Sequence, residues 1–432
     1  MYRVLSLGLI IATIFLLSIV SLLYIAHDQQ ARSQTNTTTT TTTITTSISS
    51  SNKMMKGNNS LQDRVFVANE LSNTVSVINP QTNSLEKTID LTGFDSRKPF
   101  SFNATKPLLS MPLTPLYNGA IFVHGMNSSP DGKIVAVAAR GSSNIYLINA
   151  SSFEKIGSSG GVFVGREPHV PTFTPDGQEI WVTVRGSNYI ATINISDAVE
   201  NKSIFYNEAI PTVNGPSMVW FSKDGRLAFV GSQKESVMDV IDVVSKKSIS
   251  TVNLSKADPA AFSPFIKTTP DGKEIWLTHK NADSLSVVST QQPFNITSTI
   301  QLENGSKPNH IEFSNGSGRD GGYYAYVTLA TVAPKTNTSK IIIINTANKS
   351  IVGSFDSHGK EAHGIWANPE GTRLYVGHEQ TPKLTVFDIN GANATHPVLF
   401  SEIDLDSLQM PDGQLLKNEK SIDVIYDRII IN

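Results

Sequence analysis

Hydrophobic and polar residues alternate along most of the chain in short segments that return at a regular interval. A turn with Asp-Gly or Glu-Gly, an apolar run, a polar turn and a second apolar run recur in 128–149, 174–194, 222–242, 269–289 and 368–388. The turn acids Asp131, Asp176, Asp224 and Asp271 lie 45, 48 and 47 residues apart. Val, Ile, Tyr and Trp at alternate positions favour strands, and Asp-Gly is expected to supply the positive φ of a tight hairpin turn. The pattern predicts an all-β repeat.

Each unit continues into a further strand such as 246–254, so that four antiparallel strands fill one period. This is the signature of a β-propeller blade. Six full units follow an incomplete one at 64–91, which lacks its innermost strand. The alternating C-terminal stretch 420–432 can supply it, and an open edge strand would invite aggregation. We therefore predict a seven-bladed β-propeller of four-stranded antiparallel blades, closed by pairing of 420–426 with 64–69.

The stretches "RVFVANELSNTVSVIN" and "RLYVGHEQTPKLTVFD" resemble the repeat of the YVTN-family β-propellers, common in archaeal and bacterial surface proteins. The resemblance covers 64–432 and implies the fold. More loosely, the chain is similar to the propeller domains of nitrous oxide reductase and haem d-binding nitrite reductase, and to the seven-bladed 6-phosphogluconolactonase and streptogramin lyase. One fold hosts many activities, so these resemblances leave the function open.

An uncharged apolar run of 23 residues, 4–26, follows Arg3. A bilayer-spanning helix needs about 20 apolar residues, whereas the apolar region of a signal peptide has about 7–15. The sequence predicts an N-terminal transmembrane helix that anchors the chain (1–27), with a cleaved signal peptide as the alternative, and Arg3 keeps the N-terminus inside. A Thr/Ser-rich stalk (28–62) and the propeller (63–432) follow. Fourteen Asn-x-Ser/Thr sequons favour a glycoprotein in the cell membrane, single-pass, with its body outside.

Charge and composition remove several classes of function. The formal net charge is −2, and after the N-terminus the chain has no strong block of either sign. Nucleic acid is therefore not the expected partner, because phosphate binding needs a basic face. The chain has no cysteine, which excludes disulfides, thiolate metal sites, iron–sulfur clusters and thioether-linked haem.

Histidines gather at one end of the predicted blades. In a propeller the starts of the inner strands and the ends of the second strands share one rim of the channel. His124, His169 and His363 each precede the turn residue at 131, 176 or 370 by seven positions, and we interpret His310 as their equivalent. His279 and His378 align with each other at second-strand ends. Six of the nine histidines thus map to one rim.

Converging imidazoles can bind copper, zinc or haem iron without cysteine. The resemblance to nitrous oxide reductase implies a copper cluster, although the cysteines of that enzyme's second copper centre are absent. We predict that at least three of the six histidines come close enough to share an ion. The alternative is structural: each histidine bonds the backbone of a neighbouring blade.

Charged residues flank the same positions. Arg140 and Arg185 lie in the parallel stretches "ARGSSN" and "VRGSN", and Glu361 and Glu379 flank two of the histidines. They are candidate ligand-binding residues, with solvated turn charges as the alternative. A 29-residue insertion, 92–120, is predicted to lie on the same rim, as a lid or packed outside the disc.

The sequence therefore predicts an extracytoplasmic, membrane-anchored propeller that binds a surface protein or a small-molecule ligand at the histidine-rich mouth of its channel. One alternative is a His-ligated copper or haem metalloprotein of redox type. A second is a lactonase- or lyase-like enzyme that uses the rim His, Glu and Arg side chains as acid–base groups.

Overall fold

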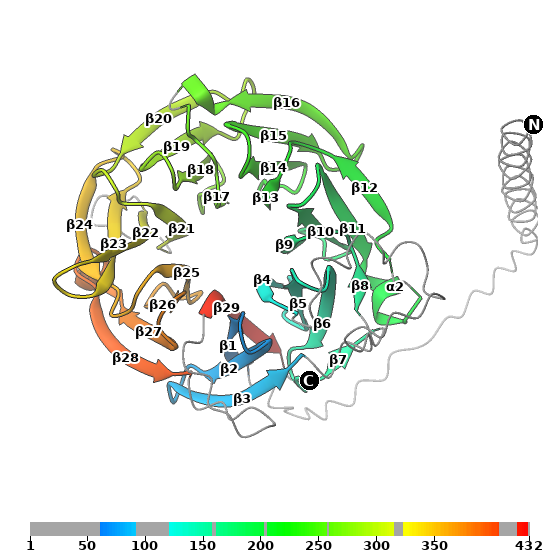
Figure 1. Ribbon diagram of the computed structural model, residues 1–432, viewed down its shortest axis with the longest axis horizontal. Helices are drawn as coiled ribbons and strands as arrows, with labels where there is room; N and C mark the ends of the chain where they lie inside the picture. Colours follow the sequence, from blue (N-terminus) through cyan, green and yellow to red (C-terminus); the bar gives the residue numbers. More distant parts are fainter. Residues whose placement is uncertain are drawn as a thin grey trace, which may run out of the picture. The chain divides into compact units, whose positions relative to one another are not determined.

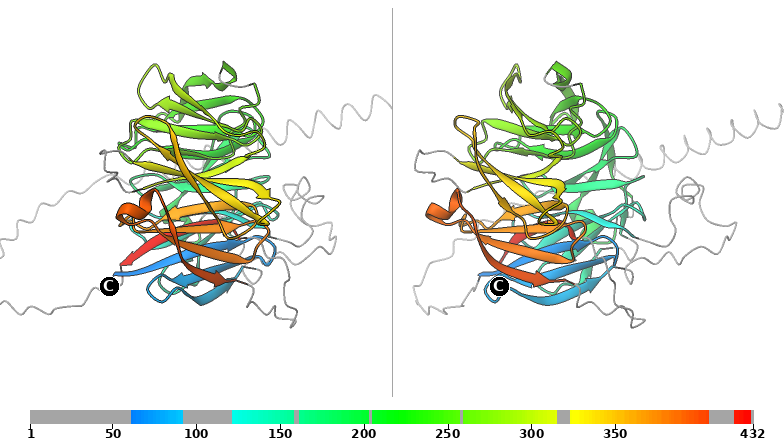
Figure 2. Two further views of the ribbon diagram at one scale, coloured as in Figure 1. Left: turned by 90° about the vertical axis from the view of Figure 1, so that its left-hand side faces the viewer. Right: turned by 60° about the vertical axis from the view of Figure 1, so that its left-hand side comes forward.

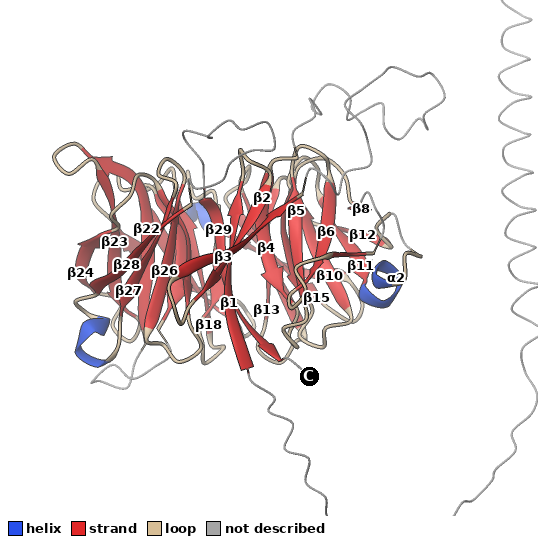
Figure 3. Ribbon diagram, turned by 90° about the horizontal axis from the view of Figure 1, so that it is seen from below, coloured by secondary structure: helices blue, strands red, loops and turns tan. Residues whose placement is uncertain are grey.

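A computed structural model of the chain describes residues 61–91, 121–157, 161–202, 205–256, 259–314, 323–405 and 421–430. All of them belong to one compact unit, Asn58–Asn432. In this unit seven antiparallel sheets surround a central channel, each with one strand at the channel and one at the rim (Figure 1). Seen from the side, the strands run from one face of the disc to the other, and loops lie at both faces (Figures 2 and 3).

The elements of the first four blades are given in order from the channel outwards. Blade 1 contains β29 (Ser421–Ile430), β1 (Leu61–Asn69), β2 (Thr74–Asn79) and β3 (Ser84–Asp90). Blade 2 contains β4 (Val123–Ser128), β5 (Ile134–Ala139), β6 (Asn144–Asn149), β7 (Lys155–Ile156) and β8 (Val162–Phe163). Blade 3 contains β9 (Pro168–Phe173), β10 (Glu179–Val184), β11 (Tyr189–Asn194), helix α2 (Ile195–Val199) and β12 (Glu208–Pro211). Blade 4 contains β13 (Pro216–Phe221), β14 (Leu227–Ser232), β15 (Val237–Asp242) and β16 (Lys247–Asn253), followed by the 3₁₀ turn η3 (Leu254–Lys256).

The other three blades repeat the same order. Blade 5 contains β17 (Ile266–Thr268), β18 (Glu274–His279), β19 (Ser284–Ser289) and β20 (Ile296–Gln301). Blade 6 contains β21 (Pro308–Phe313), β22 (Tyr324–Ala333), β23 (Thr338–Asn345) and β24 (Ile351–Asp356). Blade 7 contains β25 (Ala362–Ala367), β26 (Arg373–His378), β27 (Lys383–Asp388), the 3₁₀ turn η4 (Gly391–Ala394) and β28 (Val398–Asp404).

The two ends of the propeller close the ring, as predicted. β29 pairs antiparallel with β1 from Asn69↔Ser421 to Leu61↔Ile430, and the red strand lies beside the blue one in Figure 1. The pairing covers the predicted segments and extends past them, so β1 begins at Leu61 instead of 63. Blade 2 departs from the repeat, because its outer strand is split into β7 and β8, both paired with β6.

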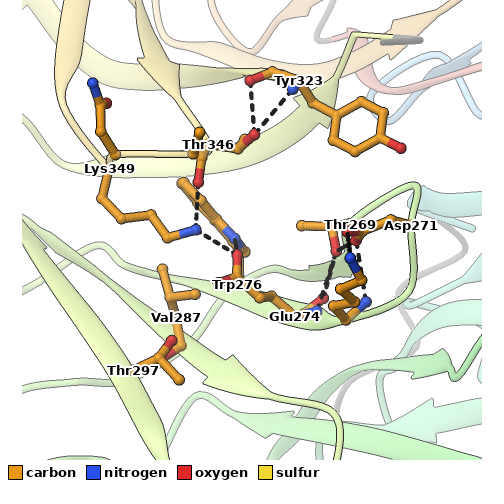
Figure 4. A network of polar contacts seen from close by, with 12 residues as sticks. Thr269, Asp271, Glu274, Trp276, Val287, Thr297, Tyr323, Thr346 and Lys349 are labelled. Atoms are coloured by element: carbon orange, nitrogen blue, oxygen red, sulfur yellow. Dashed lines mark hydrogen bonds and ion pairs between the residues drawn. The ribbon is translucent and has the colours of Figure 1, made fainter. Parts of the chain in front are cut away.

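The hairpin turns differ from the prediction in one respect. The glycines have positive φ, for example +66° at Gly132 and +75° at Gly272, but the preceding aspartates do not. The aspartate instead accepts hydrogen bonds: Thr269 Oγ1 donates to Asp271 Oδ1 at 2.7 Å (Figure 4). In blade 4, hydrogen bonds from Ser222 and Arg226 lower the pKa of Asp224 to about 2. The acid therefore stabilises the turn through its side chain, as an Asx-type acceptor.

Large apolar side chains fill the spaces between the blades, with Trp181 and Trp276 fully buried. Polar contacts join neighbouring blades at the rim of this core. Lys349 of blade 6 reaches Glu274 of blade 5 at 2.6 Å, and the same carboxylate accepts the indole N–H of Trp276 at 3.1 Å (Figure 4). The blades thus form one continuous ring around the channel.

The predicted anchor (1–27) and the insertion (92–120) lie outside the described residues. In the part of the chain that the structure does describe, no helix is long and apolar enough to span a bilayer.

Candidate functional site

Five inner strands, β4, β9, β13, β21 and β25, have equivalent positions, and a bulge follows the start of each of these five. In four of them the first residue pairs with the last residue of the second strand: Val123↔Ala139, Pro168↔Val184, Pro216↔Ser232 and Ala362↔His378. In blade 6, Pro308 pairs with Leu329, and β22 continues to Ala333. In all five, the register shifts before the strand ends. A bulge sets two residues against one and redirects side chains. This local irregularity lies at the end of the channel where the histidines were predicted.

The register corrects one assignment. His124, His169 and His363 occupy the second position of their strands, as expected, but Asn309 holds that position in β21. His310 is one residue further along. It nevertheless reaches the same cavity as Asn309, because the bulge loosens the strict alternation of sides.

Four histidines line a cavity of about 320 Å³ at this end of the channel, which we call the histidine chamber. Their rings form an arc around it. The ring centroids of His169 and His124 lie 4.6 Å apart, those of His124 and His363 6.3 Å, and those of His363 and His310 4.3 Å. Phe265 stacks on His310 at 4.2 Å and ends the arc. Gly125 permits this approach, because a Cβ there would lie 2.3 Å from the carbonyl oxygen of His169.

A collar of polar side chains surrounds the chamber. Six blades contribute one side chain each, from the residue that directly follows the second strand. These residues are Glu70, Arg140, Arg185, Gln233, Lys280 and Glu379. Backbone hydrogen bonds fix the collar: the N–H of Arg140, Arg185 and Glu379 donates to the carbonyl of Phe122, Glu167 and Glu361. Each of these three acceptors has a φ between +51° and +56°, just before its inner strand. The fold thus holds charged side chains at one level of the channel.

The collar has an acidic and a basic sector. On the acidic side, Glu379 Oε1 lies 3.1 Å from His363 Nε2, and Glu70 Oε1 lies 3.2 Å from Arg140 Nη1. On the basic side, Arg185 Nη1 donates to Gln233 Oε1 at 3.1 Å. Lys280 makes no ion pair with any described residue. The chamber therefore presents carboxylates at one wall and cations with an amide at the other.

Burial keeps three of the four chamber imidazoles uncharged. Desolvation lowers the pKa of His124, His169 and His310 well below 6.5. Neighbouring charges act in the same direction: His169 and Arg140 on His124, Arg185 on His169, and His363 on His310. At neutral pH these three rings are therefore neutral donors and acceptors, and the fixed positive charges are those of the collar.

Several polar atoms of the chamber are unsatisfied. Nδ1 of His124, Nδ2 of Asn309 and Nε of Arg140 are buried and make no hydrogen bond. The nearest charged group to His124 Nδ1 is the carboxylate of Glu70, whose Oε1 lies 3.8 Å away, beyond hydrogen-bond distance. His124 and Asn309 are only 6% and 2% exposed. Buried polar groups are paired in the great majority of cases, so an orphan group at a cavity indicates a missing partner. The chamber has hydrogen-bonding capacity left for a ligand.

His279 and His378 do not join the other four. Both are fully buried; His279 Nε2 lies 2.8 Å from Ser286 Oγ, and His378 Nε2 lies 3.0 Å from the carbonyl oxygen of Ser357. Burial lowers the pKa of His378 to about 4. His378 thus makes the kind of backbone contact that the structural alternative describes, whereas His279 bonds a serine side chain of its own blade. The side chain of Glu361 does not line the chamber either, although its backbone holds Glu379.

Among the residues that the structure describes, no group of three or more His, Asp or Glu side chains is placed to hold a metal ion. The rings of the arc contact one another, but His169 Nδ1 faces the carbonyl oxygen of Ser217 and His363 faces Glu379. The copper, zinc or haem site stays a prediction of the sequence.

Glu70, Gln233, Lys280 and Asn309 were not predicted. The first three stand one residue after a second strand, as Arg140 and Arg185 do. Aligning the repeat at that position would have found them. Asn309 was not predicted because His310, the next residue, was assigned to the second position of the inner strand, which Asn309 occupies.

Comparison with known proteins supports the fold. No family model matches the chain, and no curated protein does. Solved structures match with low identity. A hydrazine synthase chain of Kuenenia stuttgartiensis aligns with a TM-score of 0.56 at 17% identity over 72% of this chain and 96% of its own. PpgL, a periplasmic gluconolactonase of Pseudomonas aeruginosa, aligns with a TM-score of 0.56 at 12% identity over 86% of this chain and 100% of its own. The protein is a seven-bladed β-propeller similar in fold to both.

Proposed function

We propose that the propeller binds a small hydroxycarboxylate in the histidine chamber. The observation that carries the proposal is the two-sided collar above neutral, incompletely hydrogen-bonded imidazoles. A volume of about 320 Å³ fits one small molecule, at the lower end of ligand pockets, which span about 300–1,000 Å³.

The basic sector is suited to the carboxylate end of such a ligand. Arg185 offers a planar fork of N–H donors and Lys280 offers an ammonium that no described residue pairs. Gln233 and the amide nitrogen of Asn309 add uncharged donors.

The acidic sector is suited to the hydroxyl end. Carboxylates and neutral imidazole nitrogens accept hydrogen bonds from hydroxyl groups. Glu70, Glu379 and Nδ1 of His124 lie on this side. A dianion without hydroxyl groups would meet the two carboxylates and bind less well.

Calorimetric titration of the purified full chain with gluconate tests the proposal, with gluconamide as the probe that lacks the charge. Gluconate should bind, and Lys280→Gln should weaken it by about 10–100-fold, the loss of a charge-assisted hydrogen bond of about 1.5–3 kcal/mol. Phe400→Leu, an exposed site outside the chamber, is the matched control. Equal affinity for gluconate and gluconamide would contradict the proposal.

A lactonase activity is the second candidate, and the His363–Glu379 contact at 3.1 Å favours it. A carboxylate that orients an imidazole is a common arrangement for a general base. Water would add to the lactone carbonyl carbon and pass a proton to His363, and the ring C–O bond would break as that proton reaches the leaving alkoxide. Arg140 or Arg185 would stabilise the oxyanion.

Release of acid from glucono-δ-lactone, measured by pH-stat against the spontaneous rate, tests this candidate. Activity should fall by about 10²–10⁴-fold in His363→Gln, the usual contribution of general acid–base catalysis. If the protein binds gluconate but does not hydrolyse glucono-δ-lactone, the lactonase activity is excluded and the binding function remains.

We propose further that the propeller acts outside the cytoplasm on a membrane anchor. The apolar run 4–26 and the sequons support this placement. Protease added to intact cells should release the folded body by cutting between Asn36 and Ser60; a body reachable only from the cytoplasmic side would refute the placement.

A further inference from the structure

The opposite end of the channel carries a second cavity, of about 510 Å³. It is lined by the ends of the inner strands β9, β13, β17, β21 and β25 and by the hairpin turns that follow them. Four consecutive inner strands, from blades 4 to 7, each contribute one residue to its floor and walls. Trp220, Glu312 and Trp366 are the fifth residues of β13, β21 and β25, and Lys267 is the second residue of the shorter β17. We call this cavity the tryptophan mouth.

An ion pair forms the floor. Lys267 Nζ lies 2.9 Å and 2.7 Å from the two carboxylate oxygens of Glu312, and both side chains are about nine-tenths buried. Replacing such a pair by apolar residues is often neutral or stabilising, because two charges must be desolvated to form it. The stability of the fold alone therefore gives little reason for the pair.

Two indole rings form the walls. Lys267 Nζ lies 4.2 Å from the ring centroid of Trp366 and 5.1 Å from that of Trp220. Both rings are partly exposed, unlike Trp181 and Trp276, which are fully buried and donate their indole N–H to a glutamate. Within the described chain, no group accepts the indole N–H of Trp220 or Trp366. The mouth thus has flat apolar faces with free donors at their edges.

This arrangement selects a class of ligand. An organic cation is excluded, because the ammonium of Lys267 already occupies the position between the rings. The floor pair has no net charge, so it gives an anion no advantage. A neutral sugar ring fits: its C–H face packs on an indole, and its hydroxyl groups can both donate to Glu312 and accept from Lys267.

We infer that the tryptophan mouth is a binding site for a neutral carbohydrate, with one pyranose ring packed against Trp366 or Trp220 and its hydroxyl groups on the Lys267–Glu312 pair. The site is separate from the histidine chamber, at the other end of the same strands, and does not rest on the function proposed there.

Titration of the purified full chain with glucose, galactose, mannose, N-acetylglucosamine and their β-linked disaccharides tests the inference. Tryptophan fluorescence is a direct readout, because the other two of the four tryptophans are fully buried. At least one sugar should give a saturable change, confirmed by calorimetry.

Trp366→Ala and Trp220→Ala should each weaken that binding by about tenfold or more, whereas the control Phe400→Leu, an exposed ring elsewhere, should leave it unchanged. Lys267→Gln and Glu312→Gln each replace a charged group of the floor by a neutral amide, so the hydrogen bonds to the sugar should become weaker and binding should fall. Thermal melts check that these variants fold. No saturable response to any of these sugars overturns the inference. So does binding that is unaltered in both tryptophan variants.

Discussion

The two ends of the channel are built by the same strands and yet have opposite chemistry. At the histidine chamber, the second and third residues of the inner strands place neutral imidazoles below a charged collar. At the tryptophan mouth, residues near the other ends of four inner strands place two indoles around an internally neutralised ion pair. The repeat thus specifies positions without specifying chemistry, and each end can acquire its own ligand class.

The bulge of blade 6 adds a side chain to the chamber. Two consecutive residues of β21, Asn309 and His310, both line the cavity there. Past the bulge, the fifth residues of β13, β21 and β25 line the other mouth. Local backbone geometry therefore decides how many side chains each end receives.

The largest effect is expected at the tryptophan mouth. Lys267→Met should cost about 3–5 kcal/mol of unfolding free energy, because it leaves the carboxylate of Glu312 buried without its partner. Lys267→Met with Glu312→Leu should recover most of the loss. Urea unfolding of Lys267→Met, Glu312→Leu and the double variant measures these changes. A double variant as unstable as Lys267→Met would show that the ion pair itself stabilises the fold.

Acid should act on the histidine end. Burial lowers the pKa of His378 to about 4 from 6.5, so the unfolded chain takes up a proton between these values and the folded chain does not. Stability should therefore fall as the pH drops from 6.5 toward 4, by roughly 3 kcal/mol from this residue. The free energy of unfolding, measured at pH 7 and at pH 5, should differ less for His378→Gln than for the wild type. An equal difference in the two proteins would contradict the lowered pKa of His378 as its cause.

Blades 2 and 3 approach each other closely at the histidine chamber. Gly125→Ala places a Cβ 2.3 Å from the carbonyl oxygen of His169 and should cost about 1–3 kcal/mol by overpacking. Gly305→Ala is a contrasting case: no atom lies within 4 Å, and only its positive φ disfavours a side chain. Thermal unfolding should rank Gly125→Ala as the less stable of the two.

The smallest effect is expected when Arg185 keeps its positive charge but loses the planar guanidinium group. Arg185→Lys keeps the positive charge of the basic sector but loses the hydrogen bond to Gln233 and the planar donor set. Gluconate affinity should fall only a few-fold, in line with about 0.5–1.5 kcal/mol for one hydrogen bond. The affinity of this variant is compared by titration with that of Arg185→Gln, which loses the charge as well and should lose more affinity. Equal losses in the two variants would mean that the charge contributes nothing and that the planar donor set alone matters.

The sequence determined the architecture of this protein. Alternating apolar runs and Asp-Gly turns are local signals, and the missing inner strand at 64–91 together with the unassigned strand at 420–432 required the ring to close. It also placed Arg140, Arg185, His124, His169 and His363 at one end of the channel, because position in a repeat translates directly into position in a blade.

Only the tertiary structure decided which side chains share a site. His279 and His378 are the last residues of their second strands and directly precede the collar residues Lys280 and Glu379. Their rings nevertheless turn into the interior, where His279 bonds Ser286 and His378 bonds the carbonyl of Ser357. Lys267 and Glu312 lie 45 residues apart and meet only because neighbouring inner strands converge at the channel. Sequence periodicity fixes the order of residues along a strand; the direction of a side chain depends on bulges and on the adjacent blade, which no single repeat contains.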